Sequence, residues 1–238
     1  MSTIFSLDTS SRYISISVTR SDKIRFEYHF TSRDELSTVL IQSIENVLNN
    51  VPGGLSLEEI DAFGICIGPG LFTGLRVGMA TLKGFLLGSG KPVIPVNSLE
   101  ATAYPFHEST IPVVSMIDAR RNEVYIAVYN FTDGEGKELI SPALINISEL
   151  KNYLSAIEYP LNEMHWTGSG SEVYKSLIQA NFQGSQFLTT SPFLAPWIDR
   201  IALSRFTKNN YITNLSDLLP FYIRKPDAEI NYGKQDRG

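Results

Sequence analysis

The sequence predicts an α/β protein of two lobes that repeat one structural unit. The chain has 238 residues, enough to bury a sizeable core. A strand, an aspartate, a polar turn and an alternating strand follow one another twice, and each copy continues into a third strand and a helix. We expect lobes at residues 1–106 and 107–190. A C-terminal helix and tail at 191–238 should pack back on the first lobe.

The first lobe should begin with three strands. Residues 3–7 are mostly apolar and end at Asp8, residues 13–18 alternate between apolar and serine side chains, and residues 24–30 form a similar third run. Apolar residues at helical spacing then predict a helix over 34–50; they are Leu36, Leu40, Ile44, Val47 and Leu48.

A second strand–helix–strand unit completes this lobe. Residues 62–67 form a short apolar run that leads into a glycine-rich loop, which predicts a buried strand. A helix over about 74–87 and a strand over 93–96 should follow. Ser98 is then expected to cap a further helix.

The second lobe should repeat this order. Residues 113–117 form an apolar strand that ends in Asp118, and residues 123–129 alternate. Placing Asp118 on Asp8 aligns the two alternating strands without a gap. A strand at 139–147 and a helix at 148–157 should follow. Pro196 suits the first turn of a last helix over about 196–209, and a polar tail ends the chain.

Composition excludes several classes of function. There are 25 acidic and 20 basic residues, giving a net charge of −5, so strong autonomous binding to nucleic acid is disfavoured. A single cysteine, Cys66, and three scattered histidines predict neither a disulfide nor a zinc site. The N-terminus has no export signal and no run of 18 apolar residues occurs, so we expect a cytoplasmic protein without a membrane span.

The glycine-rich loop is the sharpest local feature. Gly68, Gly70, Thr73, Gly74 and Arg76 lie where a strand passes into a helix, so backbone N–H groups could hold an anion there. The loop matches neither the P-loop nor the dinucleotide pattern. A tight turn with no ligand is the alternative.

The helix after this loop lacks a charged face. Its core stripe is Leu75, Met79, Leu82 and Leu86, whereas the opposite side carries only small or apolar residues, namely Val77, Ala80, Gly84 and Gly88. A helix-interior glycine costs about 1 kcal/mol relative to alanine, so Gly78, on a third edge of the helix, and Gly84 suggest close packing. Burial within the lobe and a subunit interface are both open.

A second group of residues could form a nucleotide or anion site in a cleft between the lobes. Asp8, with Thr9 beside it, and Asp118 end equivalent strands, where carboxylates could orient a magnesium ion or a water. Arg120 and Arg121 could meet a phosphate or a carboxylate of a partner, although such a pair is often a solvated turn. For each aspartate, a role in a β-turn is the alternative.

Several segments together resemble one protein family. Residues 68–84 resemble the GPGSFTGLRIGxxxAKG signature of the TsaB (YeaZ) family, and residues 117–125 resemble its DARRxEVY segment. The start at 7–10, the stretch 95–101 and the segment 219–224 also match. These matches occur in family order and span nearly the whole chain.

The resemblance implies an actin-like, sugar-kinase-like, ribonuclease H-like duplicated fold. It also implies a function as a non-catalytic partner subunit of the bacterial synthase of N6-threonylcarbamoyladenosine at position 37 of tRNA. In that complex such a protein binds and activates a TsaD-like catalytic paralogue. A TsaE-like ATPase joins them, and tRNA binds through the complex. When the chain is alone, we expect it to form a homodimer.

The resemblance further implies the absence of catalytic and metal-binding residues. TsaD-like subunits carry a histidine pair, where this chain has Ser98 and Thr102. No cofactor of its own is expected, and ATP or ADP would belong to the complex. We expect the helices at 34–50 and 74–87 to form the partner-binding face, through Leu36, Leu40, Ile44, Val77, Ala80, Gly84 and Gly88.

An autonomous ATPase or small-molecule kinase of the same fold is the alternative function. Such an enzyme needs a cleft carboxylate, two phosphate loops and an adenine-binding glycine segment. Asp8 and Thr9 could serve the first loop, and Gly168 and Gly170 resemble the adenine segment. The second loop, at residues 118–122, has neither glycine nor hydroxyl side chains, which favours the partner subunit.

Overall fold

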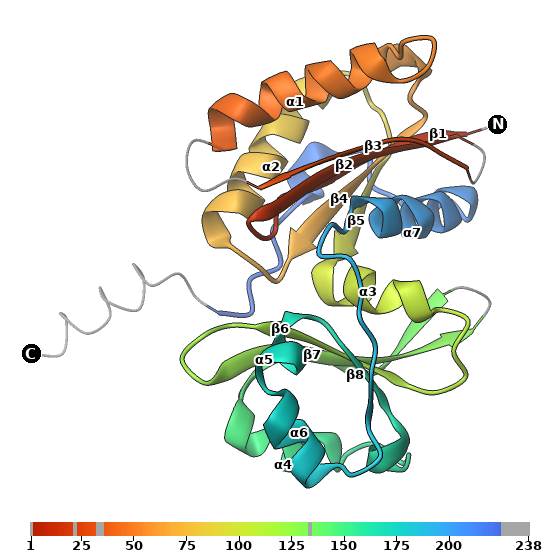
Figure 1. Ribbon diagram of the computed structural model, residues 1–238. Coiled ribbons are helices and arrows are strands. Elements are labelled where there is room, and N and C mark those ends of the chain that lie inside the picture. Colours follow the sequence, from red (N-terminus) through yellow and green to blue (C-terminus); the bar gives the residue numbers. More distant parts are fainter. Residues whose placement is uncertain (1, 21–22, 32–35, 133–134, 225–238) are drawn as a thin grey trace, which may run out of the picture.

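The computed structural model describes residues 2–20, 23–31, 36–132 and 135–224. It has five layers, in which helices and sheets alternate (Figure 1). Helices α1 (Leu36–Asn50) and α2 (Phe72–Leu86) cover the outside of the first sheet. The second sheet lies on the other side of a central helical layer. The duplicated, two-lobed α/β class predicted from the sequence is confirmed.

The first sheet has five strands in the order β3-β2-β1-β4-β5. Strand β2 pairs antiparallel with β1 and β3 pairs antiparallel with β2, whereas β4 pairs parallel with β1 and β5 pairs parallel with β4. The strands are β1 (Thr3–Asp8), β2 (Tyr13–Arg20), β3 (Lys23–Thr31), β4 (Ala62–Gly68) and β5 (Val93–Asn97).

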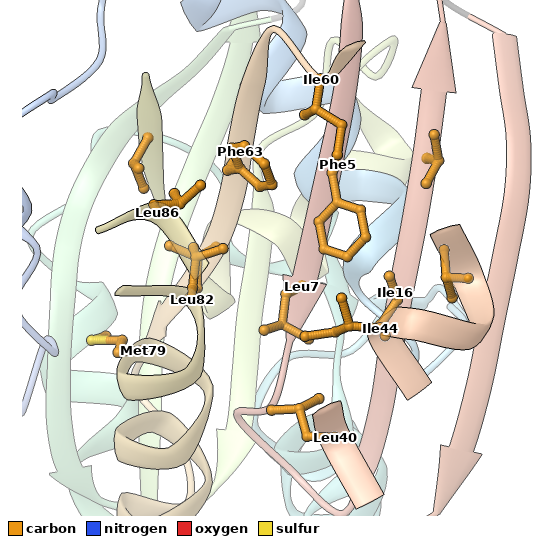
Figure 2. Packing of buried hydrophobic residues seen from close by; sticks show 14 of the residues in the cluster. Phe5, Leu7, Ile16, Leu40, Ile44, Ile60, Phe63, Met79, Leu82 and Leu86 are labelled. Atoms are coloured by element: carbon orange, nitrogen blue, oxygen red, sulfur yellow. The ribbon is translucent and has the colours of Figure 1, made fainter. Parts of the chain in front are cut away.

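One face of this sheet packs on α1 and α2 (Figure 2). Leu40 and Ile44 of α1 point toward Leu7 and Ile16 of the sheet, and these side chains are at most 3% exposed. The apolar stripe that predicted α1 is thus the face that the helix buries in its own lobe.

The second sheet has the strand order β10-β9-β6-β7-β8. Strands β6 to β10 are the repeats of β1 to β5 in turn, so this order is that of the first sheet read from the other edge. Helices α4 (Leu150–Leu154), α5 (Ser169–Val173) and α6 (Lys175–Asn181) accompany it. The strands are β6 (Val113–Asp118), β7 (Glu123–Thr132), β8 (Glu135–Asn146), β9 (His165–Thr167) and β10 (Gln186–Phe187).

Helices α3 (Ser98–Ala103) and α7 (Ala195–Thr207) form the central layer. Helix α7 contacts β1, β2, β4 and β5, so the C-terminal helix lies against the first sheet. Apolar side chains of both sheets share one core here, for example Ile4 of the first and Val113 of the second. Single 3-10 turns lie at 57–59, 104–106, 147–149, 161–163 and 215–217.

The two hairpins differ in register by one residue, which the gapless alignment missed. Asp8 pairs with Ser15, whereas Asp118 pairs with Val124, one position earlier in the aligned numbering. Side chains alternate between the faces of a strand. Asp118 therefore lies on the same face of its strand as Met116, which packs in the outer core of the second lobe. Asp8 lies on the same face of its strand as Ile4, which packs in the central core.

Other expectations change at the ends of elements. The cap of α3 is Asn97, whose side chain accepts a hydrogen bond from the Leu99 amide at 2.8 Å, and not Ser98. The predicted helix at 148–157 is one 3-10 turn followed by α4. Elements β9, α5, α6 and β10 had no predicted counterpart. The predicted start of the first helix at Asp34 and the tail beyond residue 224 lie outside the described residues.

Candidate functional site

The glycine-rich loop is filled by the turn between β1 and β2. A β-carbon on Gly70 would overlap the main-chain oxygen of Ser10, and one on Gly74 would overlap that of Thr9. The Leu71 amide also donates a hydrogen bond to the Ser10 oxygen at 2.6 Å. The absence of side chains on these glycines therefore lets the turn between β1 and β2 lie directly on the start of α2. This packing is a structural reason for the glycines that needs no ligand.

Asp8 and Thr9 are buried by this packing. Asp8 is 0% exposed, its Oδ1 accepts a hydrogen bond from the Ser10 amide at 2.9 Å, and its Oδ2 has no partner among the described residues. Burial raises the pKa of Asp8, and hydrogen bonds from Ser10 oppose that rise. The expectation that Asp8 faces an open cleft is wrong, because α2 and the central layer cover it.

Arg76 lies on the exposed side of α2 and binds aromatic side chains. Its guanidinium lies 3.9 Å from the Phe72 ring centroid, and its Nε donates a hydrogen bond to the Tyr222 hydroxyl at 3.1 Å. The Phe72 and Tyr222 rings are 4.8 Å apart. Thr73, on the same turn of the helix, is exposed.

Residues 219–224 join the two lobes, and we call this segment the C-terminal strap. The Phe221 amide donates to the Ile67 oxygen at 2.8 Å on the first lobe. On the second lobe, Arg224 donates to the Ala119 oxygen at 3.0 Å and forms an ion pair with Glu123. Figure 1 shows this last blue stretch passing between α2 and the β6 end of the second sheet. Sequence patterns give no sign of these contacts.

The turn between β6 and β7 has unusual backbone geometry. Arg120, Arg121 and Asn122 have φ angles of 59°, 56° and 59°, and all three side chains are exposed. Non-glycine residues disfavour this left-handed region. The Arg120 amide donates a hydrogen bond to Asp118 Oδ1 at 2.9 Å, so Asp118 has the role in a turn that was the alternative to a magnesium or water site.

The predicted adenine segment packs on β6. A β-carbon on Gly168, whose φ is 91°, would overlap the Met116 main-chain oxygen, and one on Gly170 would lie 3.0 Å from the Met116 side chain. Ser169 Oγ accepts a hydrogen bond from the Asp118 amide at 3.2 Å. Close approach to the strand thus accounts for both glycines.

The positions of the family's histidine pair are closed by hydrogen bonds. Ser98 Oγ donates to the Pro69 oxygen at 2.5 Å, and Thr102 Oγ1 donates to the Ser98 oxygen at 2.8 Å. Both side chains are buried. Across the described residues, we find no group of three or more histidine, cysteine, aspartate or glutamate side chains that could hold a metal ion.

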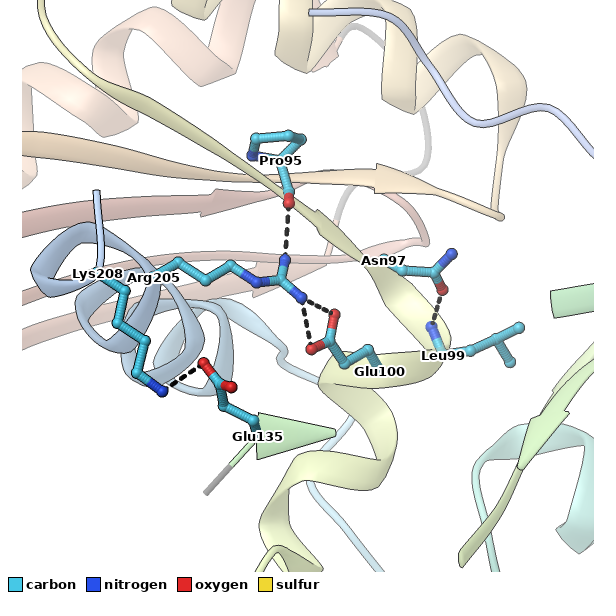
Figure 3. A network of polar contacts seen from close by, with 7 residues as sticks. All are labelled: Pro95, Asn97, Leu99, Glu100, Glu135, Arg205 and Lys208. Atoms are coloured by element: carbon cyan, nitrogen blue, oxygen red, sulfur yellow. Dashed lines mark hydrogen bonds and ion pairs between the residues drawn. The ribbon is translucent and has the colours of Figure 1, made fainter. Parts of the chain in front are cut away.

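Glu100 on the same helix is held by α7 (Figure 3). Arg205 donates to both oxygens of Glu100, at 2.7 and 2.8 Å, and to the Pro95 oxygen at 3.0 Å. Burial raises the pKa of Glu100, and the Arg205 charge opposes that rise. Lys208 pairs with Glu135 of the second lobe at 2.6 Å. This network fixes α3 and α7 against both sheets.

The predicted partner face divides into buried and exposed residues. Leu40 and Ile44 lie in the lobe core, so they cannot contact a partner, and this part of the expectation is wrong; Leu36 also packs partly on that core. Ala80, Gly84 and Gly88 are exposed and Val77 is half-buried, so α2 is not enclosed on every side. The sequence missed Val39, Ile41 and Leu87, apolar residues that are 39%, 46% and 83% exposed.

Two hollows lie in other parts of the described structure. One of about 420 Å³ lies beside α6 and one of about 160 Å³ lies beside Glu100 and Arg205. Neither is lined by a residue of the predicted nucleotide site. Within the described residues, every helix is too short or too polar to cross a bilayer.

Comparisons with known proteins agree with this architecture. The family model for TsaD, tRNA N6-adenosine threonylcarbamoyltransferase, matches residues 31–232. The tRNA threonylcarbamoyladenosine biosynthesis protein TsaB of Haemophilus influenzae is 28% identical over 93% of both chains. The TsaB protein of Bacillus subtilis is 22% identical over 97% of both.

A solved structure of YeaZ from Pseudomonas aeruginosa superposes with a TM-score of 0.76 at 22% identity, covering 93% of this chain and all of that one. The fold is therefore shared along nearly the whole chain, and the resemblance to TsaB (YeaZ) proteins is confirmed. Since the family model spans most of its length, the chain belongs to the tRNA N6-adenosine threonylcarbamoyltransferase (TsaD) family.

Proposed function

We propose that this chain is a non-catalytic subunit of a bacterial tRNA N6-threonylcarbamoyladenosine synthase complex, in which it binds and activates a TsaD-like catalytic paralogue. The observation that carries this proposal is the similarity to a TsaB protein over 93% of both chains. In this proposal a TsaE-like ATPase and tRNA join through the complex, and the complex works in the cytoplasm.

The absence of a catalytic role is supported by how the chain uses its own residues. Ser98 and Thr102 replace the two histidines of TsaD-like subunits, and each donates its hydroxyl to a main-chain oxygen of the chain. Serine and threonine lack the imidazole nitrogen of histidine, which is the commonest metal ligand, and both of these side chains are buried. We infer that catalysis needs the paralogue.

A similar argument applies to nucleotides. The turn at Thr9 and Ser10 occupies the glycine-rich loop that a phosphate would need, and Asp8 is enclosed beneath it. A phosphate cradle requires backbone N–H groups that a ligand can approach closely. ATP or ADP would therefore bind elsewhere in the complex, and not in this chain.

The outer side of α1 and α2 is the proposed partner face. Helix α2 presents Ala80 and Gly84, with Arg76 and Lys83 at neighbouring positions of the same face, and Leu87 follows its last turn. Helix α1 packs beside α2 and adds Val39 and Ile41. Small residues let a second helix approach closely, and the exposed apolar ones would be removed from water on binding. A homodimer of the isolated chain would use the same face.

Sedimentation of this chain, alone and mixed with the catalytic paralogue, tests the proposal. The unchanged chain should form a heavier species in both cases. No atom lies within 4 Å of a β-carbon built on Gly84, so Gly84→Arg should fold normally but place a long cation on the interface and prevent assembly. Lys151→Arg, on the other lobe, is the control. Equal masses for the unchanged chain and a folded Gly84→Arg variant would refute the interface.

A further inference from the structure

The C-terminal strap joins the lobes in a different way from the chain itself. The chain crosses from the first lobe to the second through residues 104–112 and returns through residues 188–194. The strap lies after α7, between α2 and the second sheet (Figure 1), and reaches the second lobe through the side chain of Arg224. A connection of this kind can open while every covalent crossing stays in place.

The first-lobe end of the strap is held by several kinds of contact. Leu218, just before the strap, is 0% exposed in the core that α1 and α2 cover. The Phe221 amide donates to the Ile67 oxygen at 2.8 Å, which ties the strap to the end of β4. The Tyr222 hydroxyl accepts a hydrogen bond from Arg76. Buried apolar area and main-chain hydrogen bonding both favour this position, so the strap belongs to the first lobe.

The second-lobe end of the strap is held by Arg224. Its guanidinium donates to the Ala119 oxygen at 3.0 Å, forms an ion pair with Glu123, and lies 6.0 Å from the centroid of the Tyr125 ring. The side chains of Arg224 and Glu123 are 23% and 34% exposed. Water and salt therefore reach this contact, and an ion pair in such a place contributes little to stability. The strap is held more weakly here than on the first lobe.

The strap and the Lys208–Glu135 ion pair join the lobes at opposite ends of the second sheet. Strand β7 begins at Glu123, which Arg224 contacts, and ends at Thr132, which pairs with Glu135. At the Glu135 end, the ion pair is part of the network that fixes α3 and α7 (Figure 3). A rotation of one lobe about the Glu135 end would therefore displace the Glu123 end most.

We propose that the C-terminal strap is a releasable latch between the two lobes. While Arg224 is docked on the turn between β6 and β7, the lobes keep the orientation of this structure. When Arg224 leaves, the strap stays on the first lobe and the lobes rotate apart at the Glu123 end, with the central layer as the pivot. Release exchanges polar contacts for water and keeps Leu218 buried, so it needs far less free energy than unfolding a lobe.

Distances between two spin labels test this proposal on the full, isolated chain. Thr73→Cys at the start of α2 and Glu172→Cys on α5 place one label on each lobe, both at exposed positions. Helix α5 lies at the strap end of the second sheet, where Ser169 contacts Asp118. Cys66 is 1% exposed and should stay unlabelled. An excess of unlabelled chain removes distances between copies.

Arg224→Met removes the guanidinium group and keeps most of the side-chain length. At low salt the unchanged chain should give one narrow distance distribution, and the variant a longer and broader one. Glu123→Gln should act in the same direction, because it removes the charge that Arg224 contacts, and it provides the same test if Arg224→Met does not fold. Added salt should shift the unchanged chain toward the variants, since the ion pair is partly exposed.

Lys208→Met is the matched control, because it removes the other ion pair between the lobes. It should leave the distance distribution unchanged, since the rest of the network still joins the lobes at that end. Circular dichroism checks that each variant is folded. The proposal is wrong if folded Arg224→Met and the unchanged chain give the same distribution, or if Lys208→Met broadens it equally.

Hydrogen exchange at the Phe221 amide distinguishes a latch from a segment that simply detaches. In Arg224→Met this amide should keep its protection, because its hydrogen bond to Ile67 lies within the first lobe. Loss of this protection without a change in the distances would show that Arg224 secures the strap and not the lobes, and would overturn the proposal. These measurements use no partner, so their outcome is independent of the proposed function.

Discussion

The hydroxyl group of Thr9 occupies the space that a β-carbon on Gly78 would need. Thr9 belongs to the turn between β1 and β2, and Gly78 lies in the middle of α2. This contact joins the first hairpin to the helix and accounts for a glycine that helix propensity alone disfavours.

Gly78→Ala should therefore destabilise the chain by about 1–3 kcal/mol, because the added methyl group overpacks a buried contact. Gly84→Ala is the matched control on the same helix. No atom lies within 4 Å of its β-carbon, so it should stabilise the chain by about 0.5–1 kcal/mol through helix propensity. Urea unfolding measures both free energies of unfolding. The same sign for both substitutions would contradict this account of the glycines.

A buried carboxyl group in α7 should make stability depend on pH. Asp199 is 0% exposed and accepts a hydrogen bond from Thr19 at 2.8 Å, and burial raises its pKa to about 7. The folded pKa lies above the unfolded value, so the unfolded chain ionises first. The stability associated with this group is full below about pH 4 and is lost as pH rises to about 7.

Asp199→Asn keeps the shape of the side chain and removes this titration. Relative to the unchanged chain, the variant should gain on the order of 2–4 kcal/mol between pH 4 and pH 8, because one pKa unit corresponds to about 1.4 kcal/mol. Urea unfolding at several pH values measures this difference, with the exposed Asp217→Asn as control. A difference that stays constant with pH would show that Asp199 does not titrate in the folded protein.

Nucleotide binding by the isolated chain should be weak. Because the turn at Thr9 fills the glycine-rich loop and the second turn carries arginines in place of glycines, we expect ATP affinity no tighter than millimolar, about −4 kcal/mol. Isothermal calorimetry measures this affinity, and Asp8→Asn should leave it unchanged. Micromolar binding, or steady ATP hydrolysis by the purified chain, would favour an autonomous kinase or ATPase.

The larger elements could be predicted from the sequence because their patterns are local. Alternation in β2 and β7 and the apolar spacing of α1 mark each element and its apolar face. Strand β9 has three residues and β10 has two, too few to produce a period. The one-residue difference between the pairs Asp8–Ser15 and Asp118–Val124 depends on turn geometry, which a gapless alignment cannot represent.

The candidate site was only partly predictable for a similar reason. Gly70 and Gly74 suggested an anion-binding loop or a tight turn, and Gly78 suggested close packing, but the sequence could not say that the chain's own Thr9 and Ser10 lie against all three. Leu40 and Ile44 form a stripe that fits an interface and a core equally well, and only the position of the sheet decides. The contact between Arg76 and Tyr222 joins residues 146 positions apart, and no local pattern encodes it.

The central claim is that this chain contributes a surface, and not a catalytic group, to tRNA modification. Its direct test is a reconstitution with tRNA, threonine, bicarbonate, ATP, a TsaD-like subunit, a donor-making enzyme and a TsaE-like ATPase, followed by mass spectrometry of the tRNA nucleosides. Alone with tRNA and the small substrates, the chain should modify nothing. Added to the complete mixture it should switch on threonylcarbamoylation, Asp8→Ala should keep much of that activity, and Gly84→Arg should abolish it. Equal yields of the modified nucleoside with the chain included and omitted would contradict the account.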